Sequence, residues 1–475
     1  MNHHGNKDIV LFLSASIRSH VVPSLYLARL LSADYEVVYA VTNEVLAELV
    51  TENGYRAIMN TGWRVGYQME GGYLAAQKQR PTYRRLLKAY RTDELYHARK
   101  QELDTIVNEL RPVAIIIDLF VCMDFWLLND RRDEFKLLFF NPMPSTYRVP
   151  GYPTVSEGYW HKDRAGTSAT VPPKTKKLKL SDWLRRPKAT LIHRAIQHNS
   201  QRVQTMAQAL PDYPLSDDAT VTQVITNVPE LLLAPLEFEL SPAVRKPNQH
   251  YLGLCQCEDR HDTELDAAFA DQWPQLLADR LPGEKWVYCS FGTFHEGADA
   301  TLLRFVTNLL DIVRALPTVR LVCSVNKYLI ETLRARNLVP ANAHFFSRVP
   351  QLRVLAEADL FITHGGFGSI KESIHFGVPM LVYPLDPMYD QTGNALKVEH
   401  HGLGLRGLFA HERVEDLKKK MTKLLEEEMY KENVREFRQL TRSQYGEEGI
   451  TKELRHLITG QHQGKLVEEQ NLAAA

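Results

Sequence analysis

The sequence predicts an α/β protein with two domains, each built on a parallel sheet, that face one another across a cleft. Its 475 residues exceed one ordinary domain. Short apolar runs alternate with helical patterns in two blocks, one before residue 150 and one after Lys285. Strands separated by helices are typical of parallel sheets with right-handed crossovers. Between the blocks, Ser241-Pro242 and Lys246-Pro247-Asn248 form a loop-like stretch.

These patterns divide the chain into four parts. We expect one domain over residues 1–245 and another over residues 246–440. A charged segment with a helical pattern follows over residues 441–462, and residues 463–475 form a tail that ends in alanines.

The first block contains four apolar runs of strand length. Because these runs lack a regular polar alternation, they are typical of strands buried on both faces. We expect Pro23 to open the first helix, since proline fits a first helical turn. Residues 60–100, rich in aromatic side chains, and residues 150–190, rich in lysine, interrupt the alternation. The expected strands are Ile9–Leu13, Glu36–Val41, Val113–Ile117 and Leu137–Phe140.

The second block repeats the alternation, with helices expected over Leu302–Leu316 and Tyr328–Arg336. Ligands of parallel sheets bind at the carboxyl ends of the strands, so the loops after the strands are the places where site residues are expected. The expected strands are Trp286–Phe291, Val319–Ser324, His344–Phe346, Leu360–Thr363 and Met380–Tyr383.

Composition favours an ordinary cytoplasmic protein. The net charge is +0, which gives no indication of a nucleic-acid partner, and five scattered cysteines fit a reducing compartment. We expect no spanning helix and no secretory signal, because no apolar run is long enough and the start lacks a basic flank. The basic stretch over residues 174–188 is either a solvated loop or a contact to a membrane surface or an anionic acceptor. We expect a monomer or a weak homo-oligomer.

Two titratable residues occupy strand-end loops of the first block. His20 follows the first strand, and Asp118 closes the strand that ends at Ile117. In one parallel sheet these side chains would share an edge, and a histidine paired with a carboxylate is a general base of fixed orientation. Each residue also has a simpler interpretation, as a surface histidine at a helix start and as a turn-forming aspartate.

The most informative segment runs from His364 to Glu372, between an apolar strand and a short helix. Its glycines, including Gly366 and Gly368, let the backbone approach a phosphate closely. A helix start offers N–H groups and partial positive charge to an anion. Glu372, one turn into the helix, can accept hydrogen bonds from sugar or ribose hydroxyls. The segment predicts a bound nucleotide diphosphate.

Further candidates for this site lie in neighbouring loops. Thr293 follows a strand and offers a hydroxyl to a phosphate. Arg348, Val349 and Gln351 lead into a helix and could frame a base and a ribose, since a guanidinium can lie flat on an aromatic base.

The sequence gives no indication of a metal site or a bound cofactor. It contains no Asp-x-Asp pair to seat a divalent cation on a diphosphate. Cys255 and Cys257 lack a second pair at zinc-ligand spacing. Helix-terminal N–H groups, His364 and hydroxyls would then meet the charge of a leaving diphosphate.

Taken in order, these motifs resemble the UDP-glycosyltransferase family (family 1 glycosyltransferases), most strongly from Arg348 to Ala395. The resemblance implies the GT-B fold of two Rossmann-like domains, with the acceptor on residues 1–245 and the nucleotide-sugar donor on residues 246–440. The helix over residues 441–462 would pack back on the first domain. The matching positions are Val349-Pro350-Gln351, Leu355, Phe361-Ile362-Thr363-His364-Gly365-Gly366, Ser369, Glu372, Gly377-Val378-Pro379, Pro384, Asp390-Gln391 and Asn394-Ala395.

The resemblance also implies roles for single residues. His20 is similar to the catalytic base of the family, and Asp118 to the aspartate that holds it. Glu372 would bind the ribose, with Gln351 nearby. The diphosphate would be contacted by His364, Gly366, Gly368, Ser369 and Thr293, and the hydroxyls of the transferred sugar by Asp390 and Gln391.

The chain departs from the family pattern in four places. Arg348 stands where the family usually has tryptophan, so the stacking on the base differs. Ser19 replaces the glycine that usually precedes the catalytic histidine. Phe367-Gly368 is closer to the bacterial and animal members than to the plant members. The stretch from Pro384 to Asp390 is about two residues longer than usual, which bears on the choice of sugar.

The resemblance implies an inverting, metal-independent transfer of a sugar, with glucose expected, from a UDP-sugar to a hydroxyl of a small, largely apolar acceptor. Phenolic, polyketide or macrolide-like natural products are examples of such acceptors. We expect acceptor choice to depend on residues 60–100 and 140–190. Two alternatives remain, a nucleotide-sugar epimerase and a non-catalytic protein that binds sugar nucleotides on the same scaffold.

Overall fold

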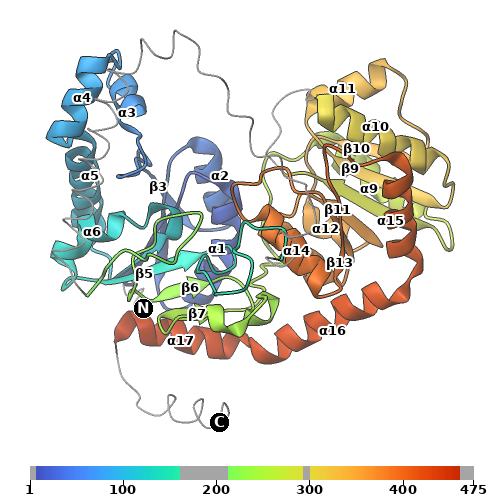
Figure 1. Cartoon of the computed structure of the whole chain (residues 1–475). Helices are drawn as coiled ribbons and strands as arrows, with labels where there is room; N and C mark the ends of the chain where they lie inside the picture. The colour runs from blue at the N-terminus through green and yellow to red at the C-terminus, as the bar shows by residue number, and fades with distance from the viewer. Residues whose placement is uncertain (1–6, 161–211, 293–299, 461–475) are drawn as a thin grey trace, which may run out of the picture.

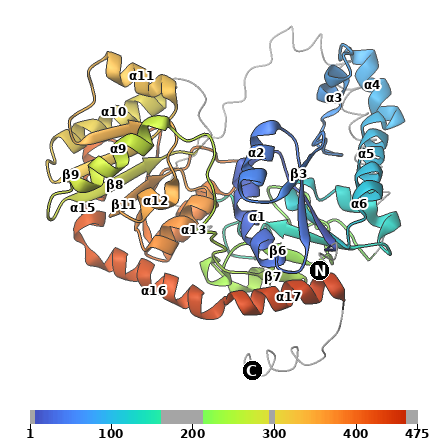
Figure 2. The same cartoon turned by 180° about the vertical axis from the view of Figure 1, so that it is seen from behind.

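The computed structural model describes residues 7–160, 212–292 and 300–460. It has two lobes side by side, each with one parallel sheet and flanking helices, as Figure 1 shows. The described part of the chain ends in two helices that run along both lobes, which is also clear from behind in Figure 2. This is the two-domain α/β architecture that the sequence predicts.

The first sheet has the strand order β3-β2-β1-β4-β5-β6-β7, and its neighbouring strands pair in parallel. Its central strands are fully buried, as their apolar sequences require. The strands are β1 Ile9–Leu13, β2 Glu36–Val41, β3 Arg56–Met59, β4 Ala114–Asp118, β5 Lys136–Asn141, β6 Glu230–Leu232 and β7 Gln249–Tyr251.

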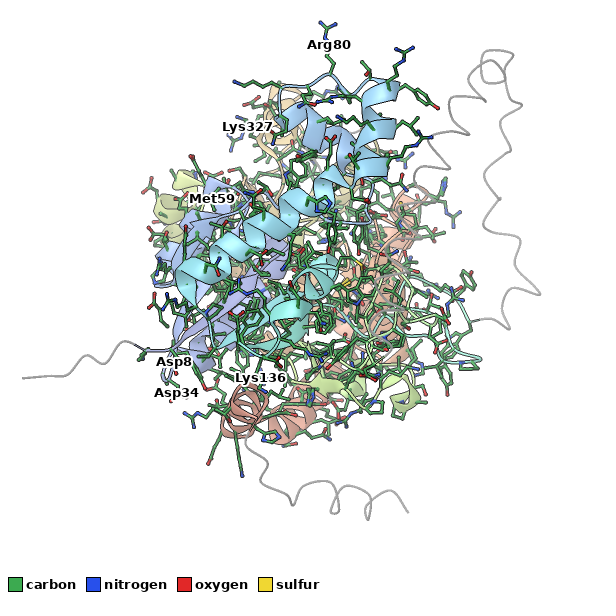
Figure 3. All side chains as sticks on the ribbon, turned by 90° about the vertical axis from the view of Figure 1, so that its left-hand side faces the viewer. Asp8, Asp34, Met59, Arg80, Lys136 and Lys327 are labelled. Atoms are coloured by element: carbon green, nitrogen blue, oxygen red, sulfur yellow. The ribbon has the colours of Figure 1, made fainter. Side chains whose placement is uncertain are left out.

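Six helices of at least five residues accompany this sheet within the described part of the first domain. Asn43 caps α2 by accepting from the backbone N–H of Leu46 at 2.9 Å. Figure 3 shows the outer side of this domain, with Arg80 at the tip of the projection formed by α3 and α4 and with Asp34 and Lys136 at the opposite end. The helices are α1 Arg18–Leu31, α2 Glu44–Glu52, α3 Glu70–Ala76, α4 Tyr83–Thr92, α5 Glu94–Leu110 and α6 Asp124–Leu128.

Three expectations for the first domain need correction. The boundary at residue 245 is wrong, because β7 belongs to the first sheet and pairs with β6. The first helix begins at Arg18 rather than at Pro23, which lies inside α1. The short strands β3, β6 and β7 were not predicted, because each includes polar side chains and forms no continuous apolar run.

The second sheet repeats the same strand order, β10-β9-β8-β11-β12-β13, also in parallel. Two of its strands, β9 and β11, have the bounds that the sequence predicts, and β13 was not predicted. The strands are β8 Lys285–Ser290, β9 Val319–Ser324, β10 Ala343–Phe346, β11 Leu360–Thr363, β12 Met380–Val382 and β13 Gly404–Arg406. The helices are α9 Ala267–Ala278, α10 Ala300–Arg314, α11 Lys327–Ala335, α12 Gln351–Leu355, α13 Phe367–Phe376, α14 Gln391–His400 and α15 Val414–Glu426.

The last two helices, α16 Glu428–Gln444 and α17 Glu447–Thr459, connect the domains. The first contacts α13 of the second domain, and the second contacts α1 of the first domain. Arg455 Nε donates to Asp34 at 2.6 Å, which adds an ion pair to the contact of α17 with the first domain. The charged segment expected over residues 441–462 is thus the end of α16 followed by α17.

The domains share one apolar interface. A single cluster of buried side chains contains residues of both domains, and the Phe238 and Phe367 rings lie 5.1 Å apart in it. Lys371 Nζ, fully buried on α13, donates to the Leu233 carbonyl of the first domain at 2.7 Å. Lys397 on α14 pairs with buried Glu239. Such an interface fixes the two sheets in one arrangement.

Within the described ranges, no helix combines the length and the apolar character that crossing a membrane requires.

Candidate active site

The two sheets carry their candidate residues at the same topological position. In the first sheet β1 neighbours β4, and in the second β8 neighbours β11, so the strand order reverses at these pairs. Ligands of such sheets bind beyond the carboxyl ends of the strands at the point of reversal. His20 and Asp118 lie at this point of the first sheet, and the turn that begins at His364 lies at that of the second.

His20 and Asp118 form a buried hydrogen-bonded pair. His20 is the third residue of α1, and Asp118 is the last residue of β4. Nδ1 of His20 lies 2.9 Å from Oδ2 and 3.1 Å from Oδ1 of Asp118. Because an ionised carboxylate can only accept, Nδ1 carries the hydrogen and the lone pair of the ring lies on Nε2. The pair is built to take a proton at Nε2.

Asp118 also fixes an apolar surface beside His20. Its carboxylate accepts from the backbone N–H groups of Ala15 at 3.1 Å and of Phe120 at 2.9 Å. The Phe120 ring lies 4.5 Å from the His20 ring. This surface is a small cluster formed by Ala15, Phe120 and Met143, against which Ile17 and Val221 pack.

The His364 ring leaves no room for a side chain at two neighbouring glycines, Gly366 and Gly292. A Cβ on Gly366 would lie 2.6 Å from Nε2 of His364, and one on Gly292 would lie 2.9 Å from Cε1. Gly365 has a φ of +87°, a left-handed conformation that favours glycine. No side chain caps α13 at Gly366, so the N–H groups of its first turn can face an anion, which the helix dipole also favours. A Cβ on Gly368 would meet no atom within 4 Å, so a ligand can approach the helix there.

Gln351 forms hydrogen bonds to two other candidate donor-site residues, Ser369 and Glu372. Gln351 Nε2 donates to Ser369 Oγ at 3.1 Å and to Glu372 Oε2 at 2.5 Å, while its Oε1 accepts from the Tyr288 hydroxyl at 3.2 Å. Arg260 Nη1 donates to the other carboxylate oxygen of Glu372 at 2.5 Å. Both oxygens of Glu372 are therefore held in place, and the remaining lone pairs can accept from the hydroxyls of a ligand.

Arg260 belongs to the segment between β7 and α9 and is a site residue that the sequence does not reveal. Its side chain is only 6% exposed, as is that of Glu372. Burial by itself lowers the pKa of the guanidinium, but the carboxylates of Glu372 and Asp262 outweigh this effect and raise the pKa. Arg260 is thus a permanent cation beside Glu372. No local motif marks it, because its partner lies on α13.

Arg348 is directed toward the same interdomain segment. Its Nη1 donates to Glu264 Oε2 at 2.8 Å, and Arg18 Nη1 lies 3.4 Å from the same oxygen. Burial, and next the charge of Arg348, lower the pKa of the Arg18 guanidinium. Arg348 therefore joins an ion-pair group at the domain boundary and does not contact Gln351 or Glu372 in the hydrogen bonds described. The neighbouring Val349 side chain is buried in the apolar core.

Asp390 and Gln391 stand at the start of α14, next to the glycine turn. Asn394 Nδ2 donates to Asp390 Oδ2 at 2.8 Å and to the Gly365 carbonyl at 3.0 Å, which ties the two segments together. Burial raises the pKa of the Asp390 carboxyl, while the Asn394 amide acts in the opposite direction. Gln391 Oε1 accepts from the backbone N–H groups of Leu385 at 2.9 Å and of Asp386 at 3.0 Å. This leaves the amide NH₂ of Gln391 as the end that can bind a sugar hydroxyl.

The two halves of the site meet next to His20. The Phe120 ring, whose centre lies 4.5 Å from that of the His20 ring, reaches the domain boundary. Tyr389, the residue before Asp390, lies with its ring 6.1 Å from the Phe120 ring. The structure therefore brings the candidate base of the first domain close to the loop that precedes Asp390 of the second domain.

One predicted residue, Thr293, lies outside the described residues. Of the expected acceptor segments, residues 60–100 contribute nothing to the apolar cluster beside His20, and residues 140–160 contribute Met143. Phe120 was not predicted, although its place two residues after Asp118 is a usable signal. Asn394 was recognised only as a position of the family signature.

Known proteins resemble this chain in sequence over part of its length and in fold over most of it. A family model described as UDP-glucoronosyl and UDP-glucosyl transferase matches residues 328–446, which include the glycine turn and α14. The NDP-glycosyltransferase YjiC of Bacillus subtilis (strain 168) is 48% identical over 67 residues, which are 14% of this chain and 17% of that protein. The putative UDP-glucuronosyltransferase ugt-46 of Caenorhabditis elegans is 30% identical over 189 residues, which are 38% of this chain and 33% of that protein.

The aligned segments thus span a third or less of the length of these two relatives. The similarity in fold extends much further. The crystal structure of the glycotransferase of kitacinnamycin superposes with a TM-score of 0.64 at 20% sequence identity and covers 95% of this chain and 99% of its own. The family match over residues 328–446 and this similarity in fold confirm the resemblance that the motifs indicate: the matched segment is similar to UDP-glycosyltransferases, and the described chain has the GT-B fold.

Proposed function

We propose that this protein is an inverting glycosyltransferase that moves a sugar from a UDP-sugar to a hydroxyl of a small, largely apolar acceptor. The observation that carries the proposal is the buried pair of His20 and Asp118, next to which the Phe120 ring faces Tyr389 of the other domain. A general base at the boundary between an apolar surface and a nucleotide-sugar site is what a direct transfer to an acceptor hydroxyl requires.

The reaction is a single displacement at the anomeric carbon. The acceptor hydroxyl gives its proton to Nε2 of His20, and its oxygen bonds to the anomeric carbon. The bond between that carbon and the diphosphate oxygen breaks, and its electron pair leaves with UDP. Asp118 stabilises the imidazolium through Nδ1, where it accepts at 2.9 Å. Attack opposite the leaving group inverts the anomeric configuration.

The charge that develops on the leaving UDP is met by the start of α13. Its N–H groups, its dipole and the adjacent His364 are fixed before the reaction, so little reorganisation is needed. We propose that these groups make the transfer independent of a metal ion. Glu372, oriented by Gln351 and Arg260, is proposed to bind the ribose.

The names of similar proteins and the apolar cluster beside His20 bear on the choice of substrates. The names of related proteins include UDP-glucosyltransferase and NDP-glycosyltransferase, which supports a nucleotide donor and makes UDP-glucose the first donor to test. The glycotransferase of kitacinnamycin has the same fold, and the apolar cluster beside His20 suits a small, largely apolar acceptor. A cytoplasmic location and a monomeric or weakly associating state stay predictions.

Mass spectrometry of reaction mixtures tests the proposal. The purified protein is incubated with UDP-glucose and a panel of phenolic, polyketide and macrolide acceptors, with EDTA and without added metal. We expect an acceptor that gains one hexose while UDP is released. A changed sugar nucleotide without consumption of an acceptor would instead identify an epimerase, and bound but unchanged UDP-glucose would identify a binding protein.

A further inference from the structure

The loop between β12 and α14 places an exposed aromatic side chain beside the candidate base. Met388 and Tyr389 are 73% and 38% exposed, whereas the residues that follow them, Asp390 and Gln391, are buried. This is the stretch that is about two residues longer than the family pattern. Exposed apolar side chains next to a reaction site suggest a surface that a substrate covers.

The loop is held in a defined position. Gln391 Oε1 accepts from two consecutive N–H groups at its start, those of Leu385 and Asp386. Asp386 Oδ1 accepts from the Met388 N–H at 2.8 Å, which closes a tight turn. Tyr389 is followed directly by buried Asp390. These four anchors present the Tyr389 ring to the first domain.

The Tyr389 ring faces Phe120, whose position Asp118 fixes. The two ring centres are 6.1 Å apart with 32° between the planes. Two aliphatic or aromatic surfaces in contact are separated by about 3.5–4.0 Å, so a flat ring between them needs about 7–8 Å. A small outward shift of the exposed Tyr389 ring therefore admits one flat ring, whereas a thicker saturated ring requires a larger displacement.

We infer that Tyr389 is a specificity-determining residue that holds a flat aromatic acceptor against Phe120, with the reacting hydroxyl beside Nε2 of His20. The inference rests on the proposed function and narrows its acceptors to phenolic compounds. The separation of 4.5 Å between the His20 and Phe120 rings allows a ring stacked on Phe120 to present its hydroxyl to the base. Aromatic stacking then supplies binding energy that a saturated alcohol of the same outline lacks.

The test compares two alcohols of the same outline, flat 2-naphthol and saturated decahydro-2-naphthol, with UDP-glucose as donor. We expect Tyr389→Ala to lower kcat/KM for 2-naphthol about tenfold, mainly through KM, because one stacking partner is lost. For decahydro-2-naphthol we expect less than about a twofold change, since a thick ring gains little from stacking. Tyr389→Phe keeps the ring and should behave as the unsubstituted protein.

Met388→Ala is the matched control, because it removes a more exposed neighbour that contacts neither Phe120 nor His20 in the interactions described. It should leave both alcohols unaffected. An equal effect of Tyr389→Ala on both alcohols, or no effect on either, would overturn the inference.

Isothermal titration with UDP and transfer to the wider acceptor panel separate this inference from the proposed function. If the unsubstituted protein binds UDP and glycosylates saturated acceptors but not 2-naphthol, the inference is wrong and the proposed function stands. If it glycosylates no acceptor of the panel, both are wrong.

Discussion

At the scale of single residues, the site depends on side chains whose partners fix their orientation before a ligand binds. Asp118 holds His20 at Nδ1 and also binds the backbone of Ala15 and Phe120. Glu372 is held in the same way by Gln351 and Arg260. Each carboxylate thereby organises one half of the proposed reaction, the base in the first domain and the ribose contact in the second.

Replacing the base should remove the chemistry and spare the donor site. We expect His20→Ala to lower kcat by about 10²–10⁴, the usual contribution of a general base. UDP affinity should stay unchanged, because His20 belongs to the other domain from the glycine turn. Single-turnover rates and titration with UDP measure the two effects. Near-normal turnover in this variant would exclude His20 as the base.

Arg260 offers a prediction that separates stability from ligand binding. In Arg260→Met, Glu372 keeps a buried charge without its cation, so the free energy of unfolding should fall by about 3–5 kcal/mol. Adding Glu372→Gln removes that charge and should restore part of the stability. If Glu372 binds the ribose, both Arg260→Met and the double variant should bind UDP more weakly than the unsubstituted protein. Urea unfolding and titration with UDP provide the two readouts, and recovered affinity in the double variant would refute the ribose assignment.

At the scale of elements, the start of α13 combines a turn that only glycine fits with a helix end that is open to a ligand. Gly366 has no room for a Cβ beside His364, whereas a Cβ on Gly368 would have no atom within 4 Å. Gly366 is therefore needed for packing against His364, whereas Gly368 leaves space for a ligand to approach the helix. The two positions can be tested as a matched pair.

We expect Gly368→Ala to fold with unchanged or slightly higher stability, because alanine loses less conformational freedom than glycine on folding and its Cβ would meet no atom within 4 Å. Its methyl group should nevertheless weaken UDP binding, since it stands where a phosphate would approach the N–H groups. Gly366→Ala should lower both stability and UDP affinity, as its Cβ would lie 2.6 Å from the His364 ring. Thermal melting with and without UDP distinguishes the two. Equal UDP affinity of Gly368→Ala and the unsubstituted protein would argue against a phosphate at this helix end.

The same scale explains how far the sequence predicts the structure. Strands of four or more residues with continuous apolar sequence, such as Ile9–Leu13 and Leu360–Thr363, have the bounds expected from their pattern. The three-residue strands β6, β7 and β13 carry no such pattern, and their pairing depends on neighbours far along the chain. Arg260 and Tyr389 escape prediction for the same reason, because each acquires its meaning from a contact between segments that are distant in sequence.

At the scale of the whole molecule, the site exists only because the domains are held together. His20 and Phe120 come from the first domain, and Asp390 and Tyr389 from the second. The shared apolar cluster, the α16–α17 pair and the buried amine of Lys371 join the two lobes. Of these, the amine of Lys371 has a pKa that burial lowers into an accessible pH range, and it therefore gives a test of the interface.

Burial lowers the pKa of Lys371 to about 8 in the folded protein, from an ordinary value of 10.5. Between these two pH values the amine is largely protonated in the unfolded chain and largely neutral in the folded protein. The free energy of unfolding therefore increases as pH rises from 8 to 10.5. The full gain corresponds to about 3 kcal/mol at 1.36 kcal/mol per pH unit. Below pH 8 both states are protonated, and the cost of burying the charge is fully present.

Lys371→Met has no proton to lose and provides the reference for this titration. At pH 7 we expect the variant to be as stable as the unsubstituted protein or more so, because a buried charge with one carbonyl partner is replaced by an apolar side chain. As pH rises toward 10.5, the unsubstituted protein should gain stability relative to the variant, since its amine becomes neutral and keeps the Leu233 contact. Urea unfolding at a series of pH values measures the free energy of unfolding of both proteins. In the difference between the two values, the titration of the groups that they share cancels. A difference that stays constant with pH would mean that Lys371 reaches solvent, and hence that the two domains separate at this point in solution.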